Sequence, residues 1–453
     1  MKLTYTVEDK PKFSQLIVFA FQQLLAIMAA TIAVPAIISG TYEGVGEVSM
    51  SMGAALFGAG VGTLVYVLFT AKKSPVFLGS SFAFLGSMST AFAGAISVAA
   101  GFAGIVLGAL FAGLVYVIIA LIVKSAGVNW LNKLMPPVII GPTVAIIGLS
   151  LAGNAVGDLR TANSGGHELI AILCGLTTLI VVTICSVYGK KMARLIPFII
   201  GILAGYALAA IFTAIGTLAD ISALMICDFS KITSINSIVS VPDFTFITAF
   251  KGFGDLTGAY IGTVAAAYVP VAFVVFAEHV ADHKNISSII ERDLLDEPGL
   301  HRTLLGDGIG SIAGAFFGGC PNTTYGESIA CVAITGNASV LTIICTACLA
   351  IIISFITPIV GFLSSIPSCV MGGVCMSLYG FIAVSGLKML QPVDLNDNRN
   401  LFTSSVILIS GIGGLTLNFG AITITSVATA LILGIIVYAI LGGMKNDIKK
   451  DIK

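Results

Sequence analysis

The sequence predicts an all-α polytopic membrane protein with fourteen transmembrane segments, arranged as two inverted repeats of seven. The chain of 453 residues is 57% hydrophobic and only 10% charged, whereas soluble domains carry roughly 25% charged residues. Apolar runs long enough to cross a bilayer recur from one end of the chain to the other. Basic residues concentrate in alternate connections between these runs, which is typical of a chain that crosses a membrane repeatedly.

The apolar runs define the expected segments in chain order. The first run follows a polar N-terminal stretch and is long enough to remain in the membrane, so we expect no cleavable signal. Two runs are short and rich in Gly, Ser, Thr or Asn, which predicts interrupted helices there. The fourteen segments are 16–38, 49–70, 76–91, 96–123, 135–153, 168–187, 195–216, 260–281, 303–319, 322–335, 338–363, 367–387, 401–415 and 420–442.

The distribution of basic residues orients these segments. All but three of the 22 Lys and Arg residues fall on one side, the exceptions being Arg160, Lys231 and Lys251. Such an excess marks the cytoplasmic face. Both termini are therefore expected in the cytoplasm of a cell-membrane protein, with the long connection 217–259 outside.

Two short motifs recur about half a chain length apart. Met135–Gly141 resembles Ile366–Gly372, and Gly79–Phe84 has a counterpart at Gly319–Thr324. Because each half holds an odd number of segments, the second half would be inverted relative to the first. Inverted repeats of this kind place a binding site at the midplane, where interrupted segments meet. Chance similarity is the alternative explanation.

Both interrupted segments favour extended backbone. Ser80–Phe84 alternates small polar and aromatic residues, and Cys320–Tyr325 contains Pro, Asn and two Thr. Non-helical backbone at membrane depth must be buried in protein or face a watery cavity. We expect two short antiparallel strands in segments 3 and 10 that pair with each other, each followed by a helix. The alternative is a pair of kinked helices.

Four acidic residues fall within or at the edge of the apolar segments, and the other acids lie in connections or tails. The four are Glu278, Asp282, Asp307 and Glu327. Ionisable side chains are costly at membrane depth and usually line a cavity or handle a proton. Glu278 and Glu327 are the best candidates for such a site, and the alternative for each is a neutral acid bonded to a carbonyl. Asp307 is either structural or peripheral.

The residues around Glu278 form two pairs at helical spacing. Glu278 and Asp282 share one face, and His279 and His283 share the next. We interpret the histidines as lying at the cytoplasmic boundary.

Two carboxylates with no Arg or Lys nearby in the sequence suit a ligand that offers N–H donors, because such hydrogen bonds are charge-assisted. Backbone N–H groups at the starts of the interrupted helices are available for ring carbonyls. The ring of Phe82 or Tyr379 is suited to stack on a planar ligand. One of the glutamates is a candidate proton carrier.

These residues resemble a known family. Pro-Asn-Thr-Thr-Tyr-Gly-Glu at Pro321–Glu327, Ala-Glu-His-Val at Ala277–Val280 and Leu-Gly-Ser-Ser-Phe-Ala-Phe at Leu78–Phe84 are similar to motifs of bacterial uracil permeases, in the nucleobase–ascorbate transporter family. Asp293–Leu295 with Pro298–Arg302 adds to the resemblance. It covers residues 12–442.

The resemblance implies a proton-coupled uracil symporter with an elevator-like mechanism, often a homodimer. It implies a core domain at 12–134 (segments 1–4) and 260–364 (segments 8–11). The gate domain would be 135–217 (segments 5–7) and 365–442 (segments 12–14), with 218–259 as an external connection.

The resemblance also assigns roles to single residues. Glu278 and Glu327 would bind the pyrimidine, Phe82 and Gly326 would offer backbone amides, and Tyr325 and Tyr379 would line the pocket. Proton coupling would involve Glu278, Glu327 and Asp282, which stands where close relatives carry His. Ser328 and Ala330 replace the family's Asn and Gly, and Asp307 resembles a position important in purine carriers. A xanthine or urate symporter of the same fold is therefore the alternative.

Other functions are less well supported. Cys345 and Cys348 form a CxxC within an apolar segment, which favours packing over a metal site. No nucleotide-binding loop is present in the sequence, so ATP-driven transport within this chain is unsupported. For a carrier of this kind we expect no cofactor, no enzymatic activity and no nucleic-acid partner. The remaining alternatives are a passive channel, an intramembrane protease acting through Asp282 and Asp307, and a sulfate- or bicarbonate-type anion carrier of the same architecture. The anion carrier is disfavoured because its anion would face two carboxylates.

Overall fold

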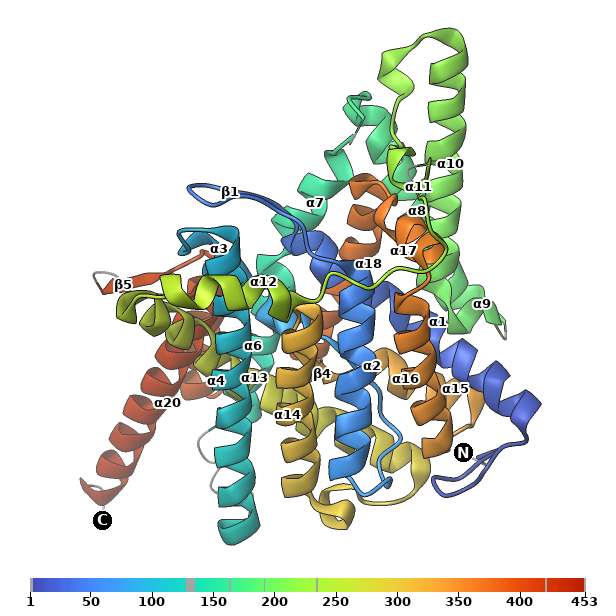
Figure 1. Cartoon of the computed structure of the whole chain (residues 1–453). Helices are drawn as coiled ribbons and strands as arrows, with labels where there is room; N and C mark the ends of the chain where they lie inside the picture. The colour runs from blue at the N-terminus through green and yellow to red at the C-terminus, as the bar shows by residue number, and fades with distance from the viewer. Residues whose placement is uncertain are drawn as a thin grey trace.

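The computed structural model describes residues 3–127, 135–162, 164–190, 192–233, 235–419 and 422–451, and most of these are helical (Figure 1). Long apolar helices satisfy their own backbone hydrogen bonds, as a chain in lipid must. In order, the longer helices are α1 (Phe13–Ile38), α2 (Met52–Phe69), α4 (Val98–Ala126), α6 (Pro137–Ser150), α7 (Ala152–Arg160), α8 (Glu168–Tyr188), α10 (Pro197–Ala219), α13 (Gly258–Ile290), α14 (Leu300–Gly318), α16 (Val340–Ser354), α18 (Ser368–Lys388), α19 (Asn398–Ile412) and α20 (Ser426–Asp451).

Eight helical spans in the described residues are long and apolar enough to cross a membrane. They are α1, α2, α4, α6 together with α7, α8, α10, α13 and α18. Shorter apolar helices occupy 82–93, 326–335, 340–354 and 426–442. The prediction of a multi-pass, mainly helical membrane protein is confirmed, while the count of fourteen segments and their inverted symmetry stay predictions.

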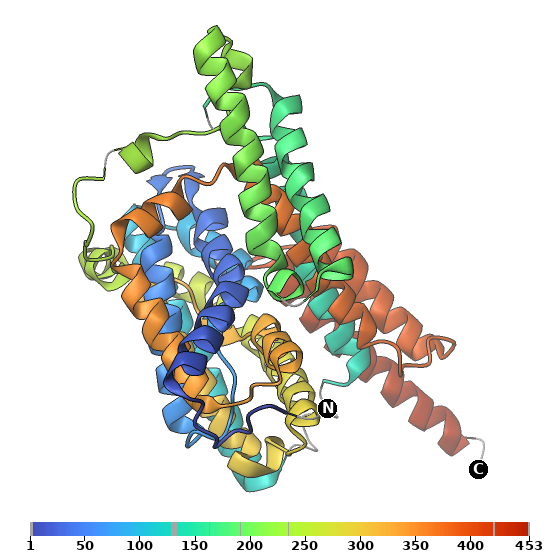
Figure 2. The ribbon, with the colours of Figure 1, turned by 90° about the vertical axis from the view of Figure 1, so that its right-hand side faces the viewer.

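The helices pack in two groups, which Figure 2 shows side by side. The first group contains α1, α2, α4, α13, α14 and α16, and the second contains α6, α7, α8, α10, α18, α19 and α20. Within the first group α2 approaches α14 closely. A Cβ atom on Gly58 would lie 2.6 Å from the carbonyl oxygen of Gly314, so glycine is needed for this approach.

Two short strands pair in the middle of the molecule. β3 (Leu78–Ser80) is antiparallel to β4 (Asn322–Thr324), with Gly79 opposite Thr323. The pairing continues beyond the strands, because Ser81 N donates to Pro321 O at 2.9 Å. The predicted antiparallel strands in the two interrupted segments are therefore present, and kinked continuous helices are excluded there.

A helix follows each of these strands. After β3 come the 3₁₀ turn η1 (Phe82–Phe84) and α3 (Leu85–Ala93), and after β4 comes α15 (Gly326–Thr335). Each helix start leaves backbone N–H groups without a partner inside its own helix. The strand pair thus sets two helix N-termini close to each other.

The connection 217–259 contains short helices of its own. It contains α11 (Ser230–Thr233) and α12 (Thr245–Gly252), and α12 packs against α4 and α14. The rings of Phe246 and Phe316 stack at 4.9 Å. Aromatic packing of this kind holds a short helix that would be marginal alone. Two further hairpins, β1 (Gly40–Tyr42) with β2 (Gly46–Val48) and β5 (Leu417–Phe419) with β6 (Ile422–Ile424), lie in other connections. The remaining short elements are α9 (Met192–Leu195), α17 (Thr357–Ser364), η2 (Ser222–Leu224), η3 (Phe253–Asp255) and η4 (Leu295–Gly299).

Candidate functional site

A cavity of about 400 Å³ lies between the two helix groups. Its walls are mainly apolar, and a few polar groups converge on it, as in most small-molecule sites. The lining from the first group and the strand region includes Phe82, Ala83, Glu278, Ala281, Asp282, Thr323, Thr324, Tyr325, Gly326 and Glu327, and the lining from the second includes Val144, Ile147, Phe198, Leu378, Phe381, Ile382 and Ser385.

Three of the sequence-predicted acids face this cavity. Glu278 and Asp282 are four residues apart on α13, which places them on one face of the helix. Glu327 lies in the first turn of α15, where the helix dipole favours a negative charge. Thr324 Oγ1 of β4 donates to Asp282 Oδ2 at 2.7 Å, so the strand pair and α13 are joined at the cavity.

Of the other residues predicted to form the pocket, three line the cavity and one does not. Phe82, Tyr325 and Gly326 line the cavity, whereas Tyr379 is not among its described lining residues. Tyr379 is 2% exposed, and its ring meets Phe82 edge-on with centroids 6.0 Å apart. The expectation that Tyr379 lines the pocket is thus corrected: it packs next to Phe82, because α18 turns this side chain toward Phe82.

Tyr325 joins the two strands. Its hydroxyl donates to Ser80 O at 2.8 Å. A Cβ atom on Gly79 would lie 2.3 Å from the Tyr325 ring. Glycine is therefore required for the aromatic side chain to approach β3 this closely.

Ser328 and Asp307, which the sequence suggested as auxiliary site residues, are not among the described residues that line the cavity. Ser328 Oγ accepts hydrogen bonds from Gln23 Nε2 at 2.6 Å and from Phe77 N at 3.1 Å, which ties α15 to α1 and to the start of β3. Asp307 on α14 is fully buried, and its Oδ2 is 2.7 Å from His279 Nδ1. Both side chains hold the scaffold around the site.

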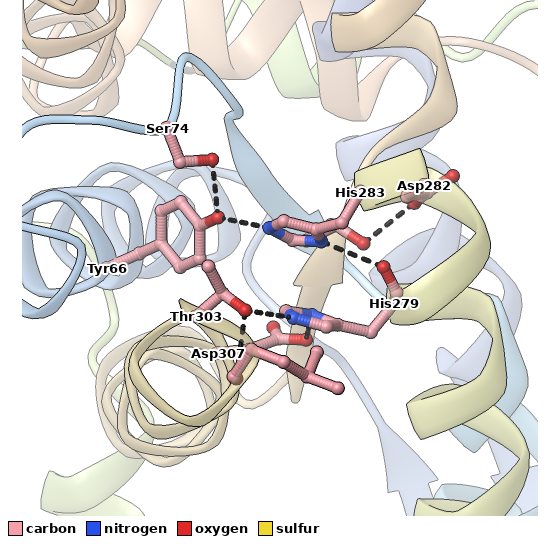
Figure 3. Close-up of polar contacts among 9 residues, drawn as sticks. Tyr66, Ser74, His279, Asp282, His283, Thr303 and Asp307 are labelled. Atoms are coloured by element: carbon pink, nitrogen blue, oxygen red, sulfur yellow. Dashed lines mark hydrogen bonds and ion pairs between the residues drawn. The ribbon is translucent and has the colours of Figure 1, made fainter. Parts of the chain in front are cut away.

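The histidines of α13 are buried inside the protein. His279 and His283 are both 0% exposed and stack with ring centroids 4.0 Å apart (Figure 3). Their place at the cytoplasmic boundary stays a prediction. Their burial was not predicted, because helical spacing identifies a shared face but not what covers it. Here α2 and α14 cover that face.

Sequence reasoning missed the partners of these histidines. Thr303 Oγ1 lies 3.0 Å from His279 Nε2, and Tyr66 Oη lies 2.6 Å from His283 Nε2. Ser74 Oγ in turn lies 2.7 Å from Tyr66 Oη. A buried Tyr or Thr in an apolar helix carries no local sequence signal of such a partner.

The cavity also contains a cation that the sequence analysis did not anticipate. Arg194 of α9 lines it, although this residue is far in sequence from every acid of the site. The inference that no Arg or Lys is near the carboxylates is therefore corrected. Three carboxylates against one guanidinium still leave the lining acidic, which disfavours an anionic ligand.

Known sequences resemble the chain over nearly its whole length. The model of the permease family matches residues 14–420. The uracil permease of Bacillus caldolyticus is 38% identical, with 96% of this chain and 94% of that protein covered. The uracil permease of Bacillus subtilis is 36% identical, covering 98% and 97%, and that of Escherichia coli K12 is 35% identical, covering 95% and 92%.

Solved structures share the fold at low sequence identity. The transmembrane domain of the cyanobacterial bicarbonate transporter BicA matches with a TM-score of 0.60 at 15% identity, covering 96% of this chain and all of that one. Murine Slc26a9, an anion transporter captured facing inward, matches with a TM-score of 0.65 at 10% identity, covering 97% and 69%. These matches establish the architecture alone, whereas the sequence relatives establish that this chain belongs to the permease family and is a membrane transporter rather than an enzyme.

Proposed function

We propose that this protein takes up uracil across the cell membrane, coupled to protons. The observation that carries the proposal is that Glu278 and Glu327, from two different helices, face one small cavity. The uracil permeases that resemble the chain along its whole length support the choice of substrate.

The cavity fits a flat, uncharged heterocycle. Ring N–H groups of a pyrimidine would donate to Glu278 and Glu327, and a hydrogen bond to a carboxylate is stronger than a neutral one. Backbone N–H groups at the start of α15 and beside Phe82 would donate to the ring carbonyls. The Phe82 ring would contact the face of the base.

Proton coupling would use the same carboxylates. Glu278, Asp282 and Glu327 surround one cavity, and like charges in a low-dielectric site repel each other strongly. A bound proton relieves this repulsion and leaves one fewer charge to carry across the membrane. Proton and substrate would therefore be transported together.

The two helix groups correspond to the proposed core and gate domains. The acidic groups of the cavity come from α13 of the first group and from α15 beside the strand pair, while mainly apolar side chains of the second group complete it. We propose that the first group moves against the second in an elevator-like step, that the seven-segment halves are inverted repeats, and that the transporter forms a homodimer in the lipid bilayer.

The described conformation fits an inward-facing state. The cavity includes Arg194 and Met389, at ends of helices that the basic-residue pattern assigns to the cytoplasm, as it does both termini. A much smaller pocket of about 70 Å³ includes Ser150 and Thr425, assigned to the opposite side. Phe82 lines both and lies between them.

Uptake in vesicles with an imposed pH gradient tests the proposal. Labelled uracil should accumulate only when the outside is more acidic, and Glu327→Gln should abolish accumulation while the protein still inserts. Unlabelled uracil should compete better than thymine or xanthine. Stronger competition by xanthine would favour the purine carrier instead, and uptake that neither saturates nor concentrates uracil would indicate a channel.

A further inference from the structure

We infer that His283 and Tyr66 are positioning residues for the carboxylates of α13, through a buried hydrogen-bond chain. This inference rests on the proposed function for its transport readout. The chain runs from Ser74 through Tyr66 to His283, whose ring stacks on His279, and ends at Asp307 on α14 (Figure 3).

The partners of His283 fix its tautomer. His283 Nδ1 is 2.8 Å from the backbone oxygen of His279, which only accepts, so Nδ1 carries the hydrogen. In the neutral ring Nε2 is then an acceptor, and the Tyr66 hydroxyl at 2.6 Å donates to it. Since the hydrogen of Tyr66 is used there, Ser74 Oγ donates to Tyr66 Oη. With a neutral His283, each polar hydrogen between Ser74 and His283 therefore has one defined position.

The partners of His279 place one proton between it and Asp307. Thr303 Oγ1 donates to Leu300 O at 3.0 Å, so it accepts from His279 Nε2, which is therefore N–H. The 2.7 Å contact of His279 Nδ1 with Asp307 Oδ2 then contains a single proton. Whichever atom holds it, the pair has no net charge.

The stacked rings couple the protonation of the Tyr66–His283 pair to that of the His279–Asp307 pair. Two imidazolium rings with centroids 4.0 Å apart in a buried site would repel strongly. A neutral His283, held by Tyr66, is therefore compatible with a proton shared by His279 and Asp307. Tyr66, His279 and His283 are all fully buried, so a polar group that loses its partner here is left unsatisfied at a high cost.

This hydrogen-bond chain fixes the rotation of α13 about its own axis at the position of the cavity acids. Glu278 precedes His279 and Asp282 precedes His283, so holding the two rings sets the direction of the two carboxylates. Pro270 interrupts the backbone hydrogen bonds of α13 two turns earlier. The C-terminal part of the helix therefore depends on side-chain anchors for its orientation.

Binding of uracil to the purified full-length protein tests the functional consequence. Tyr66→Phe removes one hydroxyl, and we expect roughly fivefold to tenfold weaker binding with a matching rise in KM, while the maximal uptake rate per inserted protein changes less than about twofold. Ser74→Ala keeps the Tyr66–His283 bond and should have a smaller effect. Unchanged affinity in Tyr66→Phe would overturn the inference.

Two comparisons separate positioning from general destabilisation. Tyr116→Phe makes the same change at another buried tyrosine of the first group, whose hydroxyl has no hydrogen-bond partner among the described residues, and it should leave affinity unchanged. In protein that already carries His283→Gln, Tyr66→Phe should cause no further loss of uracil affinity. Equal losses in Tyr66→Phe and Tyr116→Phe, or additive losses in the double variant, would contradict the positioning role.

Nitrogen NMR of ¹⁵N-histidine-labelled protein tests the chain without any substrate. His283 should give the signals of a neutral ring protonated at Nδ1, and Tyr66→Phe should shift its Nε2 resonance, whereas Tyr116→Phe should not. A cationic His283 or the opposite tautomer would refute the chain. Failure of wild-type protein to bind uracil, with the NMR result as expected, would instead count against the proposed function.

Discussion

Two adjacent faces of α13 carry ionisable side chains under opposite conditions. On the cavity face Glu278 and Asp282 are partly exposed, and the structure shows one protein hydrogen bond to them, from Thr324. On the neighbouring face His279 and His283 are fully buried, and all four of their ring nitrogens have partners.

The difference shows how one helix serves both binding and support. Polar groups that meet a ligand keep free hydrogen-bonding capacity, whereas buried polar groups must be satisfied within the protein. We therefore expect substitutions on the cavity face to change transport more than stability, and substitutions on the histidine face to change stability as well.

The largest effect on transport is expected for Glu278→Gln. The amide keeps the shape of the side chain but removes the charge that a ring N–H would meet and the site for a proton. Uracil uptake should fall to background, while thermal unfolding of the detergent-solubilised protein should occur at the same or a higher temperature. Normal uptake by Glu278→Gln would show that Glu278 does not bind substrate, and the proposed difference between the two faces would be wrong.

A large effect on stability is expected for His279→Leu. This change leaves Asp307 buried without its hydrogen-bonded partner, and such losses typically cost about 3–5 kcal/mol of unfolding free energy. A clearly lower unfolding temperature should be measured in detergent. His167→Leu changes a histidine that is exposed at the start of α8 and should be much milder; equal losses would show that burial is not the cause.

An intermediate effect is expected for Asp282→Asn. The asparagine carbonyl can still accept from Thr324, so the link between α13 and β4 persists. Without a carboxyl group at this position, uptake should continue at a reduced rate with a weaker dependence on external pH. Thr324→Val removes the hydrogen bond but keeps the acid, and its pH profile should retain the wild-type slope. An unaltered profile in Asp282→Asn would exclude this residue from proton coupling.

The smallest effect is expected outside the membrane-spanning helices. Hydrogen bonds from Lys73 and then Arg292 lower the pKa of Glu297 below its ordinary value of 4.5. A lowered pKa in the folded state stabilises the protein above the unfolded value, and the contribution disappears as the pH falls through the folded value. Since Glu297 is more than half exposed, Glu297→Gln should lower the unfolding temperature only slightly at neutral pH and not at all at high salt.

The sequence predicted features that have a local signature. The strands β3 and β4 were predictable because Pro, Thr and alternating polar residues at membrane depth leave few backbone options. Glu278 and Glu327 were found because charge is costly in lipid. The helical class followed from composition and apolar runs, and nearly every predicted segment contains a helix close to its expected bounds.

Features that depend on distant contacts were not predictable. Arg194 joins the cavity only because the second helix group packs against the first. Burial of His283 depends on Tyr66 and Ser74, more than 200 residues earlier in the chain. Helical periodicity gives the direction of a side chain but not its neighbour, so the packing of Tyr379 against Phe82 and the burial of the histidines were not predicted.

The contact between Gly79 and the Tyr325 ring has an evolutionary consequence. Gly79 on β3 and Tyr325 just after β4 share one volume, since any side chain at 79 would occupy the space of the aromatic ring. Homologues that carry a larger residue at 79 should therefore carry a smaller one at 325, and the two columns of an alignment should covary. The same compensation offers protein engineers a paired substitution for reshaping the centre of the transporter.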